Sequence, residues 1–253
     1  RLERSRQWAI RMLHESKLHN QNCFITLTYN NQSVPADYSI DLRHWQLFMK
    51  KLRKSLPQKI RFFACGEYGD QNYRPHYHAI IFNQDFNDKI IHSYNHLKQP
   101  IYTSQTLTNL WSMGHCTTQD VTYKTAAYVS RYVTKKINGE MGDDHYRRIS
   151  PVDGCYHNVR PEFGVMSRRP GLGTGYIGQF KNDFYPSGFI VVDGRKHAPP
   201  RFYISKLKEE EQTKLKRQAR RLALRHKEHT TIERRRVRAE VRDARIRSLK
   251  RDL

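Results

Sequence analysis

The stretch GEYGDQNYRPHYHAIIF, residues 66–82, holds two histidines one residue apart, His76 and His78, followed by an apolar run. A glutamate, Glu67, lies nine positions before the first histidine. The run HYHAIIF has the aromatic and β-branched composition of a strand. A Gly- and Pro-containing segment, residues 69–75, comes before it and is typical of a turn. Together with the preceding run KIRFFACGEYG, it predicts a hairpin of two antiparallel strands.

The hairpin also predicts a metal site. Alternate side chains of a strand project from the same face, so His76 and His78 direct two imidazoles to one point. The antiparallel partner strand can bring the Glu67 carboxylate across from them. Two histidines and one carboxylate suit zinc or ferrous iron, whereas Mg²⁺ or Mn²⁺ suits a site that polarises a phosphate oxygen. An ordinary pair of strand histidines remains open, since the chain has 13 histidines.

Outside the hairpin, strand and helix patterns alternate. We expect a basic amphipathic helix in residues 1–18, a strand at CFITLTY, a helix that Asp41 caps, and then the hairpin. After a polar loop follow a helix at TSQTLTNLWSMG, a strand at HCTTQDV and a helix at TYKTAAYVSRYVTKKING. This order predicts an α+β fold with a ferredoxin-like, or RRM-like, antiparallel sheet, helices on one face and the other face open.

Composition divides the chain into three parts. Residues 1–140 carry the predicted sheet and helices. Residues 141–203 are rich in Gly and Pro, and we expect accessory loops and short strands packed on the core. Residues 204–253 are highly charged with helical composition, and we expect a basic tail that is helical or partly disordered.

The charge points to a polyanionic partner. The net charge is +22, and residues 204–253 hold 18 Lys and Arg against 8 Asp and Glu, so the excess is not confined to the tail. Such a field attracts nucleic acid. No apolar run approaches the roughly 20 residues that span a bilayer, and the four cysteines form no C-x-x-C pair. We therefore expect a cytoplasmic protein with no membrane partner.

A second candidate group lies in AAYVSRYVTKK, residues 126–136. On a helix, Tyr128 and Tyr132 are one turn apart and share a face, and Lys135 and Lys136 follow within a turn. Two phenols and at least one ammonium can thus point to one place. The alternative is an amphipathic core stripe with basic residues near a helix C-terminus, which the helix dipole also favours.

Three ordered segments resemble the motifs of HUH endonucleases, the initiators of rolling-circle DNA replication: FITLTY, Glu67 with RPHYHAIIF, and YVSRYVTKK. The closest resemblance is to the replication initiation proteins of gokushovirus-type microviruses, which are small single-stranded DNA phages. It extends through RLERSRQWAIR and EFGVMSRRPGLGTGY to about residue 207. Such proteins usually carry a short cysteine-rich run just ahead of the RLERSRQWA segment, at which the printed sequence begins.

The resemblance implies an enzyme that nicks and rejoins single-stranded origin DNA in the cytoplasm of a bacterial host. A tyrosine attacks one phosphodiester, which leaves a 3′-OH for synthesis and a 5′-phosphotyrosine on the protein. Host helicase and polymerase are the implied partners, and the oligomeric state stays open. The implied site residues are Tyr128, Tyr132, Lys135 and Lys136 for catalysis, and His76, His78 and Glu67 for Mg²⁺ or Mn²⁺.

Two other functions are compatible with the residues. One is a noncatalytic basic protein that binds nucleic acid on the sheet. The other is a metal-dependent hydrolase or oxygenase that uses the two histidines and the carboxylate on a small molecule. The net charge of +22 argues against the second function.

Overall fold

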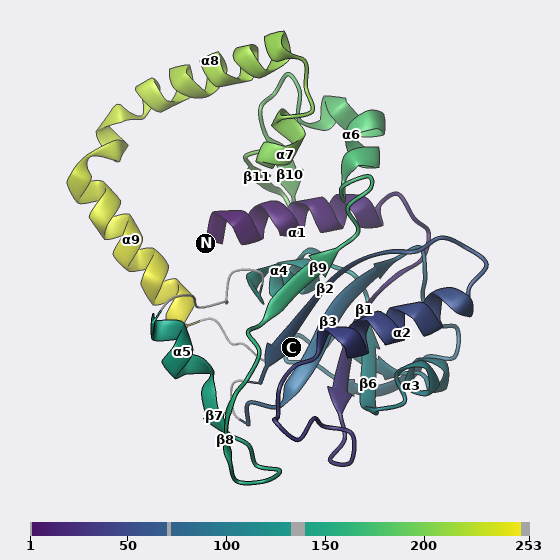
Figure 1. Cartoon of the computed structure of the whole chain (residues 1–253). Coiled ribbons are helices and arrows are strands. Elements are labelled where there is room, and N and C mark those ends of the chain that lie inside the picture. Colours follow the sequence, from purple (N-terminus) through teal and green to yellow (C-terminus); the bar gives the residue numbers. More distant parts are fainter. Residues whose placement is uncertain (1, 70–71, 133–139, 249–253) are drawn as a thin grey trace. The chain divides into compact units, whose positions relative to one another are not determined.

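The computed structural model describes residues 2–69, 72–132 and 140–248. The chain divides into two compact units (Figure 1). The first comprises Arg1–Tyr94 with Pro100–Gln179, and the second comprises Asn95–Gln99 with Phe180–Leu253. The division into residues 1–140, 141–203 and 204–253 stays a prediction from composition.

The first unit contains a seven-stranded sheet in which all neighbouring strands are antiparallel. The strands are β1 Asn22–Tyr29, β2 Arg61–Tyr68, β3 Pro75–Phe82, β4 Ile90–Tyr94, β5 Pro100–Thr103, β6 Gly114–Gln119 and β9 Phe163–Met166. Their order is β4-β5-β6-β1-β3-β2-β9. The predicted α+β class and the four predicted strands, which are β1, β2, β3 and β6, are confirmed.

The main core lies between one face of this sheet and the helices α2 Leu42–Lys54 and α3 Gln105–Trp111. The alternation of β1 places Cys23, Ile25, Leu27 and Tyr29 on this face, and all four are fully buried. The predicted cap is present, since the Asp41 carboxylate accepts a hydrogen bond from the Arg43 amide at 2.7 Å.

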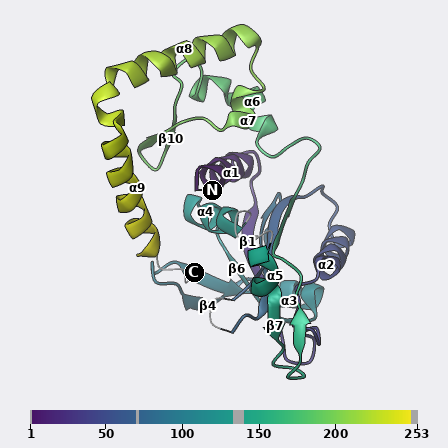
Figure 2. The ribbon, with the colours of Figure 1, turned by 60° about the vertical axis from the view of Figure 1, so that its left-hand side comes forward.

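The expectation of helices on one face is wrong, because helices pack on both faces. On the face opposite the core, α1 Leu2–Ser16 and α4 Tyr123–Tyr132 pack against each other and against the sheet. Trp8 of α1 lies with its ring centroid 5.2 Å from that of Phe63 on β2. Both helices are amphipathic, so each has an apolar stripe that the second sheet face covers. Figure 2 shows α1 and α4 on the side of the sheet away from α2.

Three strands of the sheet were not predicted. β4 and β5 form in the segment that we expected to be a polar loop, and all residues of β4 are exposed, so no alternation marks it. β9 comes from the Gly- and Pro-rich segment and pairs with β2, with Gly164 opposite Cys65. That segment also forms short helices, α5 Glu140–Tyr146 and α6 Thr174–Phe180, and a hairpin of β7 Arg147–Ile149 and β8 Tyr156–Asn158.

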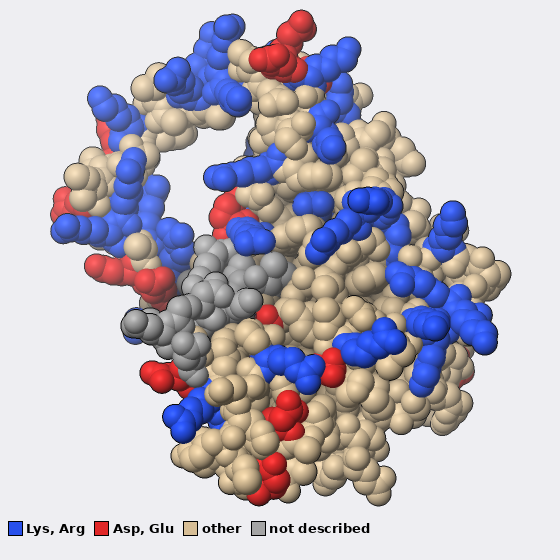
Figure 3. All heavy atoms as spheres, in the orientation of Figure 1, with Lys and Arg blue, Asp and Glu red and all other residues tan. Residues whose placement is uncertain are grey.

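The second unit contains the predicted basic C-terminal helices. They are α8 Glu209–Arg225 and α9 Ile232–Arg247, preceded by the hairpin β10 Ile190–Val192 with β11 Arg195–His197, and by α7 Arg201–Ile204. Tyr203 is fully buried and its ring lies 5.6 Å from that of Phe184, while Leu215 anchors α8. Lys and Arg side chains gather along α8 and α9 (Figure 3). Among the described helices, none has the length and apolarity to cross a membrane.

Candidate active site

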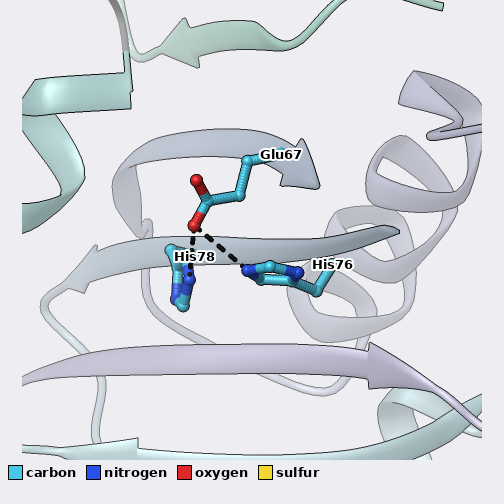
Figure 4. A group of neighbouring side chains, drawn as sticks. All are labelled: Glu67, His76 and His78. Carbon is cyan, nitrogen blue, oxygen red and sulfur yellow. Dashed lines mark hydrogen bonds and ion pairs between the residues drawn. The ribbon is translucent and has the colours of Figure 1, made fainter. Parts of the chain in front are cut away.

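The β2–β3 hairpin brings together the three predicted metal ligands. Glu67 on β2 is the direct cross-strand partner of His76 on β3, and His78 lies two residues further along the same face. The Nε2 atoms of His76 and His78 lie 3.0 and 2.9 Å from Glu67 Oε1. Figure 4 shows both imidazoles directed at this carboxylate. The three ligand atoms all lie within 4.8 Å of one another.

The hydrogen bonds around the histidines prepare both rings to bind a cation. The Nδ1 atom of His76 lies 2.9 Å from the Arg74 carbonyl oxygen, which can only accept, so Nδ1 carries the proton. In the neutral ring, Nε2 then presents a lone pair to a carboxylate oxygen, and this contact is repulsive unless a proton or a metal ion lies between them. The Nδ1 atom of His78 is held by the Thr26 hydroxyl at 3.0 Å. Such outer contacts fix the orientation of metal-ligating histidines.

The donor set therefore fits a divalent cation. Two ligands at right angles, each about 2.1 Å from an ion, lie about 3.0 Å apart, which is close to the separations measured here. Glu67 is 1% exposed and His78 is 6% exposed. Burial by itself raises the pKa of the Glu67 carboxyl, but the hydrogen bonds and charges of His76 and His78 outweigh it and lower that pKa to about 2. The carboxylate is thus ionised at neutral pH.

Tyr128 and Tyr132 lie on the face of α4 that is turned toward this group. The Tyr128 hydroxyl is 3.3 Å from His78 Nε2. The Tyr132 ring stacks on the His78 ring at a centroid distance of 5.8 Å, and the two tyrosine rings are 5.0 Å apart. The helical spacing thus places both phenols beside the three candidate ligands, as the sequence predicts.

Both phenols are protonated at neutral pH. Burial raises the pKa of Tyr128 and of Tyr132 above the ordinary value, and the nearby Glu67 carboxylate raises each further. The Arg131 guanidinium, 5.3 Å from the Tyr128 ring centroid, acts in the opposite direction on the pKa of Tyr128. Either phenol must therefore lose its proton during an attack on phosphorus, and a bound cation beside the hydroxyl favours that loss.

Five of the seven predicted site residues thus meet at one place, and the other two, Lys135 and Lys136, lie outside the described residues. The sequence reading missed Thr26, which supports His78, and Phe24, whose ring stacks on His78 at 5.6 Å. Both project from β1 on the same face by alternation. The signal was available in CFITLTY, but the pairing of Thr26 with His78 depends on the sheet order.

Comparison with known proteins gives one family match. The model of a family of replication-associated proteins of the ORF2 type matches residues 22–137, a range that includes all seven predicted site residues.

Similar whole proteins come from three phages. The chain is 31% identical over 212 residues to replication-associated protein VP4 of Bdellovibrio phage phiMH2K, an alignment that covers 80% of this chain and 63% of that protein. It is 31% identical over 207 residues to replication-associated protein ORF2 of Spiroplasma virus 4, covering 78% and 60%. It is 29% identical over 209 residues to replication-associated protein ORF4 of Chlamydia phage 1, covering 79% and 49%. The chain thus spans less than two thirds of the length of these relatives. No solved structure matches it.

Proposed function

Because the chain belongs to the ORF2-type family of replication-associated proteins and is homologous to the replication-associated proteins of microviruses, we propose that it starts rolling-circle replication by nicking DNA. It cleaves single-stranded origin DNA by transferring a phosphodiester to a tyrosine, and it later rejoins the ends to release a circle. It acts in the cytoplasm of the bacterial host.

The observation that carries the proposal is the position of two phenols beside the metal-ligand group. Tyr128 and Tyr132 both contact His78, a candidate ligand, and no other described part of the chain groups His, Cys, Asp and Glu side chains in this way. A nucleophile and a cation site that share a residue suit the transfer of a phosphoryl group to the nucleophile.

The bond changes in the proposed step balance without a further reactant. The tyrosine oxygen forms a bond to phosphorus, and the bond from phosphorus to the 3′-oxygen breaks. The phenolic proton leaves the nucleophile, and the departing oxygen takes up a proton to become the 3′-OH. The phosphotyrosine retains the free energy of the phosphodiester, so a returning 3′-OH can reverse the step without ATP.

His76, His78 and Glu67 would hold Mg²⁺ or Mn²⁺. A cation held there polarises the scissile phosphate and stabilises the charge that develops on its oxygens. Around it, the Arg74 carbonyl and the Thr26 hydroxyl keep the two imidazoles oriented. The buried carboxylate stays ionised because the pKa of Glu67 is about 2. Lys135 and Lys136 remain the candidates for assisting the loss of the phenolic proton.

The fold and the charge are consistent with this role. The strand order β6-β1-β3-β2 is the order that a ferredoxin-like split βαβ arrangement requires, and we infer that this part of the sheet is the nuclease core. The net charge of +22 supplies affinity for the DNA backbone that does not depend on sequence. Host helicase and polymerase are the proposed partners at the exposed 3′-OH.

The test uses oligonucleotides tiled across the phage genome that encodes the chain. Each is incubated with the protein and Mn²⁺ and run on a denaturing gel. We expect one origin fragment to give a covalent protein–DNA adduct and a free 3′-OH product, and EDTA to abolish both. Tight binding without any adduct, on every fragment and with either metal, would instead support a noncatalytic DNA-binding protein.

A further inference from the structure

A cavity of about 700 Å³ lies at the turn end of the β2–β3 hairpin, within the first unit. Its walls include Tyr68 and Tyr73 from the hairpin and Arg148 and Tyr156 from the β7–β8 hairpin. Its volume is in the range of small-molecule sites, about 300–1,000 Å³. Figure 1 places β7 and β8 beside the turn end of the sheet. The proposed nicking reaction uses none of these side chains.

The cavity presents planar groups that are held in place. The Arg148 guanidinium lies 4.8 Å from the Tyr68 ring centroid and 4.4 Å from that of Tyr73. The Arg147 guanidinium lies 5.3 Å from the Tyr156 ring centroid. Tyr68 is fixed because its hydroxyl donates to the Arg160 carbonyl at 2.6 Å. Tyr73 and Tyr156 are 51% and 65% exposed, so each offers a ring face to a ligand.

Two features of the cavity have no explanation within the fold. The Nη1 atom of Arg148 is buried and has no hydrogen-bond partner among the described residues, although Nε and Nη2 of the same side chain donate to His145. Leaving a buried donor unpaired is costly, and a ligand acceptor would remove the cost. Tyr73 has a φ of 48°, in the left-handed region that bulky side chains rarely adopt. Such conformations concentrate at binding sites.

We propose that this cavity binds a nucleobase of the single-stranded DNA, next to the nucleotide whose phosphate is cleaved. The proposal rests on the nicking function and names a further contact for the same substrate. The hairpin carries both sites, because Glu67 and Tyr68 are consecutive on β2 and their side chains project to opposite faces. A strand that passes the turn end of the hairpin can therefore present a phosphate to one face and a base to the other.

The chemistry of the walls favours a base over a bare phosphate. Tyrosine rings and guanidinium planes stack on unpaired bases whatever the sequence. Arg148 Nη1 can donate to a ring nitrogen or a carbonyl oxygen of the base. The carboxylates of Asp37 and Asp144 also line the cavity, and they would repel a phosphate but can accept from an exocyclic amino group.

The experiment measures binding without cleavage, in EDTA, with the full chain carrying Tyr128→Phe and Tyr132→Phe. The probes are labelled homopolymers dA, dC and dT of about 12 nucleotides and an abasic strand with the same number of phosphates, a length within the usual site sizes. We expect Tyr73→Ala and Arg148→Ala each to weaken binding of at least one base-bearing probe by roughly fivefold or more. Neither substitution should change binding of the abasic strand by more than about twofold, because the backbone contacts lie elsewhere.

Matched variants separate stacking from folding and charge. Tyr94→Ala removes another exposed tyrosine of the first unit, outside the cavity, and should change nothing. Tyr73→Phe should restore base-dependent binding, since the ring stacks without the hydroxyl. Arg148→Lys keeps the charge but loses the plane, so it should bind like Arg148→Ala.

The outcomes distinguish this proposal from the nicking function. If the cavity variants lose affinity equally for base-bearing and abasic strands, or for neither, the cavity does not hold a base, whatever the protein cleaves. If base-dependent binding requires Tyr73 and Arg148 but no DNA is ever cleaved by the unmodified chain, the base pocket stands and the nicking function is wrong.

Discussion

Glu67 and His76 face each other across the β2–β3 hairpin, with Glu67 Oε1 3.0 Å from His76 Nε2. The same carboxylate oxygen lies 2.9 Å from His78 Nε2. One strand register therefore sets the whole candidate metal group, and a one-residue slip would move Glu67 to the other face of the sheet. The account of the nicking reaction depends on this register.

Metal dependence is the first prediction. His76→Ala removes one of three ligands, so we expect no detectable nicking in Mn²⁺ while binding to single-stranded DNA stays within about twofold. Nicking is followed on a denaturing gel and binding by fluorescence anisotropy. His92→Ala is the control, because His92 is exposed on β4 and lies outside the metal group. Full nicking by the His76 variant, or by the unmodified chain in excess EDTA, would remove the metal from the mechanism.

The second prediction concerns stability against pH. Burial raises the pKa of Glu67, but its histidine partners lower it to about 2, below the usual value near 4.5. A group with a lowered folded pKa stabilises the fold fully above its unfolded pKa and loses this contribution as the pH falls toward its folded pKa. In EDTA, the difference in unfolding free energy between the unmodified chain and Glu67→Gln should shrink between about pH 5.5 and pH 3. Urea titrations measure it, and a constant difference would mean that Glu67 is not held ionised by the histidines.

Sequence patterns predicted the site better than they predicted the sheet. Alternation places His76 and His78 on one face, and helical spacing places Tyr128 and Tyr132 on another, so local periodicity was sufficient for each pair. Bringing the pairs together requires the second sheet face to be covered by α4. The sequence reading missed this because an amphipathic stripe does not reveal which face it covers.

The short edge strands were beyond such reasoning for another reason. β4 has no buried residue, and β9 has four partly buried residues and lies in a segment dominated by turn residues. Neither strand carries the alternation that marks a half-buried strand. The cavity lined by Tyr73 and Arg148 likewise joins residues 75 positions apart in the sequence. Only the fold brings the two hairpins into contact.

The third prediction concerns the last helix. Residues 226–253 hold ten Lys and Arg against five Asp and Glu, whereas Leu215 of α8 is buried, so a chain ending at residue 225 keeps the packed part of the second unit. We expect this truncation to flatten the slope of log affinity against log salt by roughly 0.7 for each phosphate that the protein no longer neutralises. The nick position should not move. A displaced nick in a folded truncation would show that this helix reads the origin sequence.

The fourth prediction concerns the two nucleophiles. Each phenol contacts His78, so Tyr128→Phe and Tyr132→Phe should each retain some cleavage of a short origin oligonucleotide. Repeated release of circles needs one tyrosine to hold DNA while the other attacks, so neither single variant should sustain it. Multiple-turnover assays on a circular template measure the difference. Tyr123→Phe, at the start of the same helix, is the control and should turn over normally.

The most direct test of the central claim is to map the residue that becomes linked to DNA. The adduct formed with an origin oligonucleotide and Mn²⁺ is digested with protease and nuclease, and the peptide that carries the nucleotide is sequenced by mass spectrometry. Two phenols beside one metal group predict adducts on both Tyr128 and Tyr132, and none in the variant with Phe at both positions. An adduct on any other residue, or one that persists in the double variant, would contradict the assignment of these tyrosines as the nucleophiles.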